Sequence, residues 1–195
     1  MGLDIICYPK GMYGENTYLI KDEASGQMAV IDPGYYETDM RMDLLSNDNL
    51  KYLLLTHAHN DHFLAVPEYL KDFPDVKLVV PEGDLELLRK YGCPEPNMTV
   101  KDGDVITLGE TELRVIGTPG HTAGGVCFAT DKVLFSGDTL FRLSVGRTDL
   151  ETGDWDTLMK SIQEKLYKLR EDIVVYPGHG METTISFEKK ANPFV

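Results

Sequence analysis

The chain has 195 residues, and its 19 basic and 32 acidic side chains give a formal net charge of −13 at pH 7. We expect residues 1–195 to form a single domain, because a chain of this length can bury a full core. The acidic surface argues against a nucleic-acid partner. No stretch approaches the ~20 apolar residues that cross a bilayer, so no membrane partner is expected either.

The three cysteines, Cys7, Cys93 and Cys127, are odd in number and far apart, without a CxxC pair. This spacing disfavours both a zinc ribbon and a disulfide framework. The first ten residues also lack the basic start and the apolar run of a signal peptide. We therefore expect a reducing, cytoplasmic compartment. Cys7 and Cys127 lie in predicted core strands and are expected to be buried. Cys93 lies in YGCPEP, a predicted surface turn, where a packed thiol is favoured over a reactive one.

Short β-branched and apolar runs alternate with turns and helical patterns along the chain. The predicted strands are Asp4–Tyr8, Asn16–Lys21, Met28–Ile31, Lys51–Thr56, Lys77–Val80, Val105–Leu108, Glu112–Gly117, Gly125–Ala129, Val133–Phe135 and Ile173–Tyr176. The predicted helices are Thr38–Leu45, a segment that opens near Pro67, Gly83–Tyr91 and Trp155–Arg170. In the last helix, apolar residues recur at helical spacing and Asp154 can cap the first turn.

Groups of strands occur at both ends of the chain, with helical segments between and after them. This order predicts an α/β fold in which two mixed sheets stack face to face. The helices would then cover the outer faces, which makes a four-layer αββα sandwich.

All five histidines fall inside three short motifs, THAHNDH at 56–62, PGHT at 119–122 and PGHG at 177–180. Two acids, one in the first motif and one in FSGDT at 135–139, bring the number of donors to seven. Each motif follows a predicted strand, so the donors are expected on neighbouring loops at one edge of the scaffold. The candidate metal ligands are His57, His59, Asp61, His62, His121, Asp138 and His179.

The spacing within THAHNDH suits two metal ions. His57 and His59 are two residues apart, and alternate side chains of an extended segment point the same way. Asp61 and His62 are adjacent, so they diverge and can serve a different metal. Without metal, convergent acids would be buried unpaired at several kcal/mol each. The sequence therefore predicts two divalent cations, zinc first, with iron or manganese also suited. Asp32 in IDPG could order the nearby loop by accepting backbone N–H bonds.

On these motifs the chain resembles the metallo-β-lactamase fold superfamily, and within it the small, single-domain relatives of glyoxalase II. The resemblance extends from IDPG at Ile31–Gly34 to YPGHG at Tyr176–Gly180. It implies the αββα sandwich that the strand grouping also predicts. It further implies one metal on His57, His59 and His121, a second on Asp61, His62 and His179, and Asp138 as a bridge between them.

Two positions separate the chain from other branches of that superfamily. Class B β-lactamases usually carry Cys, or lack a bridging carboxylate, where Asp138 stands. Flavodiiron oxygen reductases carry Glu where His59 stands. The resemblance therefore favours a dinuclear hydrolase.

The expected centre suits attack on an acyl carbon. Two metals ~3.5–4 Å apart can share a hydroxide, because bound water reaches a pKa of about 7. Two cations, two carboxylates and one hydroxide sum to about +1, so a developing oxyanion brings the centre near neutrality. Asp61 would orient the hydroxide and accept its proton. The expected reaction is hydrolysis of a thioester of the hydroxyacyl-thiol class.

The segment Asp138–Leu150 is expected to line the pocket for a small-molecule acyl-thiol, with Phe141, Arg142 and Arg147 as substrate contacts. In glyoxalase II a Lys and a nearby Tyr hold glutathione in this stretch, where this chain has Arg147 and Asp149. Arg147 could bind a carboxylate or pair with Asp149 or Asp154. The helical domain with which glyoxalase II holds glutathione has no counterpart here, which leaves the thiol carrier open.

Three alternatives stay open. The string GRTD at Gly146–Asp149 resembles persulfide dioxygenases of the same fold, which hold one iron at positions matching His57, His121 and Asp138. A lactonase is possible, because a lactone is also an activated ester. The third alternative is a metal-binding scaffold without catalysis. The sequence does not predict the oligomeric state.

Overall fold

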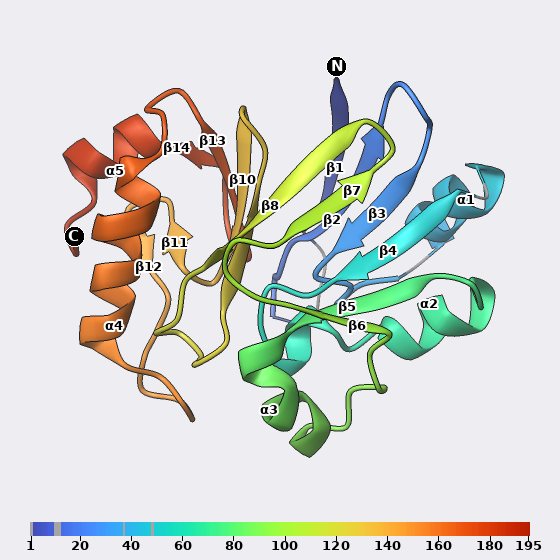
Figure 1. Ribbon diagram of the computed structural model, residues 1–195, viewed down its shortest axis with the longest axis horizontal. Coiled ribbons are helices and arrows are strands. Elements are labelled where there is room, and N and C mark those ends of the chain that lie inside the picture. Colours follow the sequence, from blue (N-terminus) through green and yellow to red (C-terminus); the bar gives the residue numbers. More distant parts are fainter. Residues whose placement is uncertain (1, 10–12, 37, 48) are drawn as a thin grey trace.

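A computed structural model describes residues 2–9, 13–36, 38–47 and 49–195. Met1 and Lys10, at the ends of the segment considered as a signal peptide, lie outside the described residues. Two six-stranded sheets face each other, with α1–α3 outside one sheet and α4 and α5 outside the other, as Figure 1 shows. The predicted four-layer αββα sandwich is confirmed. Among the described helices, none combines the length and the apolar character that crossing a membrane requires.

The first sheet has the strand order β1-β2-β3-β4-β5-β6. Its first three strands pair antiparallel and the remaining pairs are parallel, so the sheet is mixed. The elements of this half are β1 (Leu3–Tyr8), β2 (Thr17–Asp22), β3 (Met28–Ile31), α1 (Thr38–Asn47), β4 (Leu50–Leu54), α2 (Val66–Asp72), β5 (Lys77–Pro81), α3 (Leu85–Lys90) and β6 (Met98–Val100), with 3₁₀ turns at Asn60–His62 and Glu82–Asp84.

The second sheet has the order β14-β13-β10-β9-β8-β7 and is mixed because β10 and β13 run parallel. A two-stranded hairpin, β11–β12, pairs with neither large sheet but contacts β10 and β13 of the second one. The elements of this half are β7 (Val105–Leu108), β8 (Thr111–Gly117), β9 (Val126–Ala129), β10 (Val133–Gly137), β11 (Leu140–Phe141), β12 (Ser144–Val145), α4 (Trp155–Lys160) with its π-helical and 3₁₀ continuations Ser161–Lys165 and Leu166–Lys168, β13 (Val174–Pro177), β14 (Thr183–Thr184) and α5 (Ile185–Ala191).

Strand alternation divides the buried side chains into three apolar layers. In β4, Leu53 packs toward the helices of the first half and Leu54 packs between the sheets. In β9, Phe128 packs between the sheets and Cys127 packs toward the α4 side. Because both faces of the central strands are covered, their sequences are apolar at nearly every position. Each such side chain contributes roughly 1.5–3 kcal/mol when fully buried.

The predicted helix Trp155–Arg170 is helical as far as Lys168, and the Asp154 carboxylate accepts the Thr157 N–H at 2.8 Å as predicted. The sequence did not predict β6, the β11–β12 hairpin, β14 or α5. The shortest of these strands are too short to show a periodicity. A signal for α5 was present, because Thr184 caps Phe187 N at 3.2 Å and two lysines occupy the last turn.

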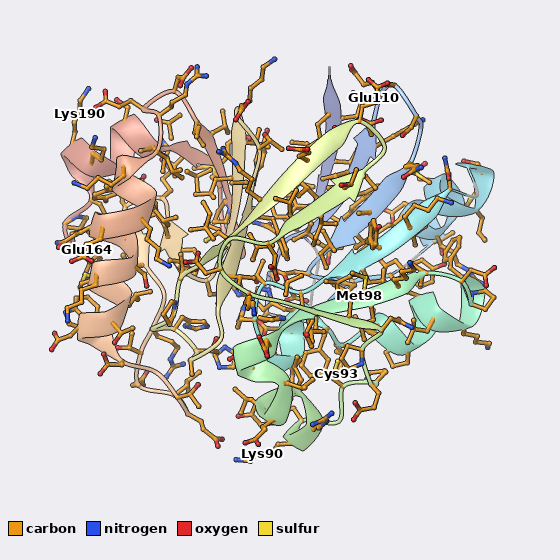
Figure 2. The ribbon with its side chains drawn as sticks, viewed as in Figure 1. Lys90, Cys93, Met98, Glu110, Glu164 and Lys190 are labelled. Atoms are coloured by element: carbon orange, nitrogen blue, oxygen red, sulfur yellow. The ribbon has the colours of Figure 1, made fainter. Side chains whose placement is uncertain are left out.

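One of the three cysteine predictions is wrong. Cys7 is exposed, because β1 is the edge strand of its sheet and has fewer neighbours to cover it. Cys93, labelled in Figure 2, is only 8% exposed, which agrees with a packed thiol. Its N–H bonds Leu88 O at 3.0 Å, which folds the turn after α3 back onto the helix. Cys127 is buried as predicted.

Asp22, at the end of β2, ties two hairpin turns together. Its carboxylate accepts hydrogen bonds from Ser25 Oγ and N and from Thr111 Oγ1. These bonds, led by the Ser25 hydroxyl, hold the pKa of Asp22 at about 2. Since an unfolded Asp titrates near 3.9, this carboxylate stabilises the fold above about pH 4, and its contribution is lost as the pH falls toward 2.

We therefore expect Asp22→Asn to lower stability at about pH 6 and to weaken the loss of stability between about pH 4 and pH 2. Urea midpoints across that range measure both effects. Asp75→Asn, at an exposed position, is the control. If the urea midpoint of Asp22→Asn fell between about pH 4 and pH 2 as much as that of the unsubstituted chain, the Asp22 hydrogen bonds would not be the source of the acid sensitivity.

Candidate metal centre

All seven side chains proposed as metal ligands lie together at one edge of the sandwich. The loops that carry them begin where β4, β8, β10 and β13 end, so the expectation that each motif follows a strand is confirmed. Asp61 and His62 occupy the 3₁₀ turn Asn60–His62. The loops after one strand of the first sheet and three strands of the second therefore meet at this edge.

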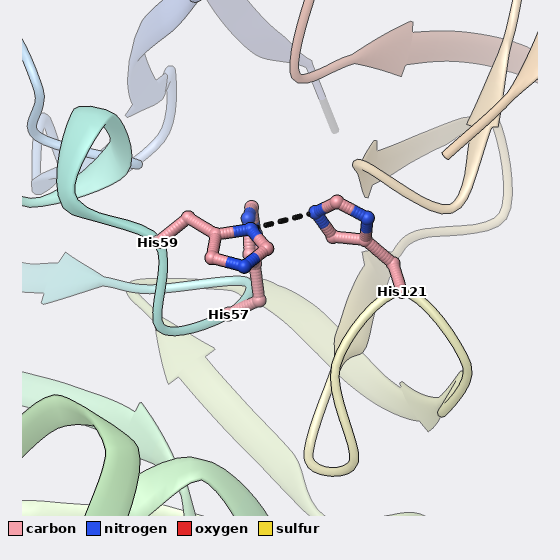
Figure 3. A group of neighbouring side chains, drawn as sticks. All are labelled: His57, His59 and His121. Atoms are coloured by element: carbon pink, nitrogen blue, oxygen red, sulfur yellow. Dashed lines mark hydrogen bonds between the residues drawn. The ribbon is translucent and has the colours of Figure 1, made fainter. Parts of the chain in front are cut away.

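The first group consists of His57, His59 and His121, which each place a ring nitrogen within 4.8 Å of the others. His59 Nδ1 lies 2.8 Å from His121 Nε2, and Figure 3 shows the rings approaching from two loops. His57 Nε2 and His59 Nε2 are buried and have no hydrogen-bond partner within the described residues. Because a buried unpaired nitrogen costs about 1–3 kcal/mol, these atoms fit a cation.

Burial lowers the pKa of His57, and the neighbouring imidazoles lower it further. Burial, followed by the approach of His121, lowers the pKa of His59 to about 4. Both rings are therefore neutral at physiological pH, the form of imidazole that binds a metal.

The second group consists of Asp61, His62 and His179, again with one ligand atom each within 4.8 Å. Asp61 Oδ2 lies 3.3 Å from His179 Nε2 and 3.6 Å from His62 Nε2. Burial would raise the pKa of Asp61, but the His179 hydrogen bond and the nearby imidazoles bring it down to about 2. Burial likewise would lower the pKa of His62, but Asp138 and Asp32 outweigh it and raise that pKa to about 10. The acids thus hold a positive charge where a divalent cation would fit.

Asp138 lies between the two groups. Its Oδ1 is 3.4 Å from His62 Nε2, and its Oδ2 is 3.4 Å from His121 Nε2 and 3.6 Å from His179 Nε2. Oδ1 is buried without a hydrogen-bond partner in the part of the chain that the structure describes. Gly178 makes room for this carboxylate, because a Cβ there would lie 2.1 Å from Oδ1. The carboxylate can therefore face a cation in either group.

Three histidines are oriented through Nδ1. His62 Nδ1 donates to Asp32 Oδ2 at 2.9 Å, and Asp32 also accepts the Thr56 N–H and hydroxyl at 2.8 Å each. The Thr56 oxygen lies 3.0 Å from His57 Nδ1, and His121 Nδ1 bonds the carbonyl of Arg147 at 2.7 Å. A proton on each Nδ1 aims each Nε2 at the centre, and on His62 a bound cation would take the place of the second proton, which Nε2 carries.

Asp32 accepts a backbone N–H, as the sequence predicted, and it does so from a left-handed backbone with φ of 50°. A non-glycine residue in that region costs of order 1–3 kcal/mol. The strain is retained because the surrounding hydrogen bonds require the carboxylate at this place.

Asp84 is a residue that sequence reasoning missed. This buried carboxylate accepts the Ala58 N–H at 3.0 Å, the Thr122 hydroxyl at 2.7 Å and the Gly124 N–H at 2.6 Å. It therefore joins the loop of His57 and His59 to the loop of His121. An acid at the start of a predicted helix was the only sequence signal, and its partners are 26 to 40 residues away.

We expect Asp84→Ala to weaken metal binding by about 10–100-fold, because both ligand loops lose a shared anchor. Three buried donors would also be left unpaired, so the melting temperature should fall. Competition against a chelator measures the metal affinity. Glu86→Ala, at an exposed position of α3, is the matched control. An unaltered affinity in Asp84→Ala would mean that the loops hold their geometry without this link.

The proposed substrate residues lie on and after the β11–β12 hairpin. The Phe141 ring centroid is 6.1 Å from that of His179, with the rings perpendicular. Arg142 is exposed, and its guanidinium lies 5.5 Å over the Phe187 ring. Phe141 thus lies beside the centre, and Arg142 lies against α5.

The Arg147 side chain forms an ion pair with Asp149, which is one of the two possibilities that the sequence left open. It is 61% exposed, and its Nε and Nη2 bond the two Asp149 oxygens at 2.7 Å each. Its backbone carbonyl, rather than its guanidinium, contacts His121. The roles of Phe141, Arg142 and Arg147 toward a substrate stay predictions.

Comparison with known proteins identifies the class. The profile of the metallo-beta-lactamase superfamily matches residues 11–179, and the chain belongs to this superfamily. The hydroxyacylglutathione hydrolase GloC of Haemophilus influenzae is 35% identical over 211 residues, which cover 100% of this chain and 98% of that protein. The chain is a hydrolase of this superfamily, whose members bind divalent metals through His and Asp clusters.

Solved structures agree with this assignment. The BLEG-1 B3 metallo-beta-lactamase matches with a TM-score of 0.86 and 31% identity, covering 98% of this chain and 99% of that chain. TTHA1623, solved in a di-iron-bound form, matches with a TM-score of 0.84 and 32% identity, covering 97% and 100%. The resemblance to small glyoxalase II-like proteins is confirmed.

Proposed function

We propose that this chain is a dinuclear metallohydrolase of the glyoxalase II type that hydrolyses a thioester of the hydroxyacyl-thiol class. The observation that carries the proposal is the pair of three-residue groups, each with its ligand atoms within 4.8 Å, and the Asp138 carboxylate that faces both. The similarity to GloC supports the substrate class.

His57, His59 and His121 would hold one cation, and Asp61, His62 and His179 the other, with Asp138 shared. Imidazole and carboxylate donors suit zinc, iron or manganese. Zinc is the first choice for hydrolysis, and the di-iron form of TTHA1623 makes iron the second. When bound, two such cations supply activated water at neutral pH and polarise a carbonyl.

Asp61 is the proposed proton acceptor, because all five imidazoles are engaged as ligands. His179 Nε2 and His62 Nε2 lie 3.3 and 3.6 Å from its Oδ2, so two imidazoles favour this position of the carboxylate. Its pKa of about 2 keeps it ionised and able to accept a hydrogen bond from the attacking water. The proton then passes to the departing thiolate sulfur, which leaves as a thiol.

Phe141 would contact the substrate next to His179, with Arg142 and Arg147 toward its charged end. The Arg147–Asp149 pair is exposed and weakened by solvent screening, so an incoming carboxylate can replace Asp149. The proposed partner is a small-molecule acyl-thiol and not a nucleic acid, in keeping with the net charge of −13. A cytoplasmic location is also proposed, since the described cysteines are all unpaired.

A thiol-release assay tests the proposal. The zinc-loaded protein would be offered a hydroxyacylglutathione, a coenzyme A thioester, a lactone, a persulfide and a chromogenic β-lactam. We expect thiol release from a hydroxyacyl-thiol, its loss on chelation and its return with zinc. Oxygen consumption with persulfide, one iron per chain and no thiol release would instead indicate the mononuclear dioxygenase. Turnover of the lactone or β-lactam alone would reassign the substrate, and an inert metal-loaded protein would favour the scaffold.

A further inference from the structure

The β11–β12 hairpin is held from outside by α5. Its tip residue Arg142 lies over the Phe187 ring at 5.5 Å, and the Ser144 carbonyl accepts a hydrogen bond from Asn192 Nδ2 at 3.0 Å. Between these two contacts lies Leu143, whose partner is also on α5. Three consecutive hairpin residues therefore touch one helix.

The partner of Leu143 is Glu188, a fully buried carboxylate. Its Oε2 accepts the Leu143 N–H at 2.9 Å and Asn192 Nδ2 at 2.9 Å, and its Oε1 accepts the Thr183 hydroxyl at 2.5 Å. These three hydrogen bonds offset the free-energy cost of burying a carboxyl group. Glu188 thus links the hairpin, the end of α5 and β14.

Leu143 needs such a partner. Its φ of 57° is left-handed, a backbone region that is unfavourable for a residue with a side chain. Its side chain is 43% exposed and provides little packing to offset that strain. The hydrogen bond from its N–H to the Glu188 carboxylate is therefore the contact that holds the turn.

The turn immediately follows Phe141, which lies against His179. We infer that Glu188 is a positioning residue that fixes the β11–β12 hairpin, and with it Phe141 and Arg142, on the substrate side of the metal centre. The inference rests on the proposed function, because only that function makes the side of the centre next to Phe141 a substrate-binding surface. It assigns to the buried face of α5 a role in substrate binding that acts through the hairpin.

Asp138, the metal ligand that precedes the hairpin in the chain, has anchors of its own. Ser136 Oγ bonds the Leu140 carbonyl at 2.8 Å, and Thr139 Oγ1 lies 2.9 Å from Thr118 Oγ1, which together hold the segment around Asp138. A loosened hairpin should therefore weaken substrate binding while the ligands stay in place.

Three variants of the metal-loaded chain separate the possibilities. Glu188→Leu removes the acceptor. Glu188→Gln keeps it, because the amide oxygen can accept from Leu143 and Asn192 while the amide nitrogen donates to the Thr183 hydroxyl, whose proton can rotate away. Lys189→Ala, on the exposed side of the same helix, is the control. Hydrogen exchange of residues 140–146, metal content, and KM and kcat for thiol release are measured.

In Glu188→Leu we expect faster exchange across 140–146 and a KM raised about tenfold, equal to about 1.4 kcal/mol, with kcat within about threefold and metal content unchanged. Glu188→Gln and Lys189→Ala should resemble the unsubstituted chain. Unchanged hairpin exchange in Glu188→Leu, or an equal loss in the Gln and Leu variants, would overturn the inference.

Asn192→Ala provides a second arm if Glu188→Leu does not fold. It removes the hydrogen bond to Ser144 and leaves the carboxylate in place, so hairpin exchange should rise, though less. Unchanged hydrogen exchange of the hairpin in Asn192→Ala would count against the inference that α5 holds the hairpin. Absence of thiol release by the unsubstituted chain would instead contradict the proposed function, while the exchange comparison would still decide whether Glu188 holds the hairpin.

Discussion

His62→Ala is expected to abolish thiol release and to remove one of two metal ions per chain. His62 is fully buried, its Nε2 faces Asp138 and Asp61, and its Nδ1 bonds Asp32. Removing the ring takes away a ligand and leaves the buried Asp32 without that partner. Breaking such a buried pair costs about 3–5 kcal/mol, so the melting temperature should fall as well. Elemental analysis and the thiol assay measure both effects.

His59→Ala should likewise abolish turnover, with loss of the cation that His57, His59 and His121 would hold. Asn60→Ala, at an exposed position between these ligands, is the control. A mononuclear dioxygenase would need neither His59 nor His62. Undiminished oxygen consumption with persulfide and an unaltered metal content in both variants would therefore favour that alternative.

The second large effect is expected from Gly178→Ala. A Cβ at this position would lie 2.1 Å from Asp138 Oδ1 and 2.8 Å from His62 Cε1. The added methyl must push the Asp138 carboxylate out of its place between the two groups. We expect the chain to fold, to bind metal at least tenfold more weakly and to lose most of its turnover.

Gly180→Ala in the same motif is the matched control. Its φ of 78° makes a side chain unfavourable by roughly 1–2 kcal/mol, but a Cβ there meets nothing within 4 Å among the described residues. Its stability should fall while its metal content persists. Metal loss of the same size in both variants would mean that Asp138 is not the affected group.

The ligand edge of the fold could be predicted because its information is local. Each donor sits in a motif a few residues past an apolar strand, as with Asp138 after β10 and His179 after β13. The grouping of strands at both ends of the chain predicts the layers, and in the structure strand alternation places Leu54 between the sheets and Leu53 outside. The gathering of all five histidines in three short motifs, with Asp61 and Asp138 in or near them, likewise predicted the seven donors.

What escaped prediction depends on contacts between distant residues. Asp84 orients ligand loops through partners 26 and 40 positions away, and Glu188 meets Leu143 across 45 positions. A buried acid with three donors has the same sequence signature as an acid on a solvated helix face. The Arg147–Asp149 pair was one of two open possibilities, because spacing alone does not tell a local ion pair from a carboxylate-binding guanidinium.

The central claim is that seven side chains from four loops hold two divalent cations. The most direct measurement is an anomalous-scattering map of crystals of the zinc-loaded chain, recorded on both sides of the zinc absorption edge. We expect two peaks about 3.5–4 Å apart, one beside His57, His59 and His121, the other beside Asp61, His62 and His179, with Asp138 touching both. A single peak at full zinc loading, or peaks away from these side chains, would contradict the account.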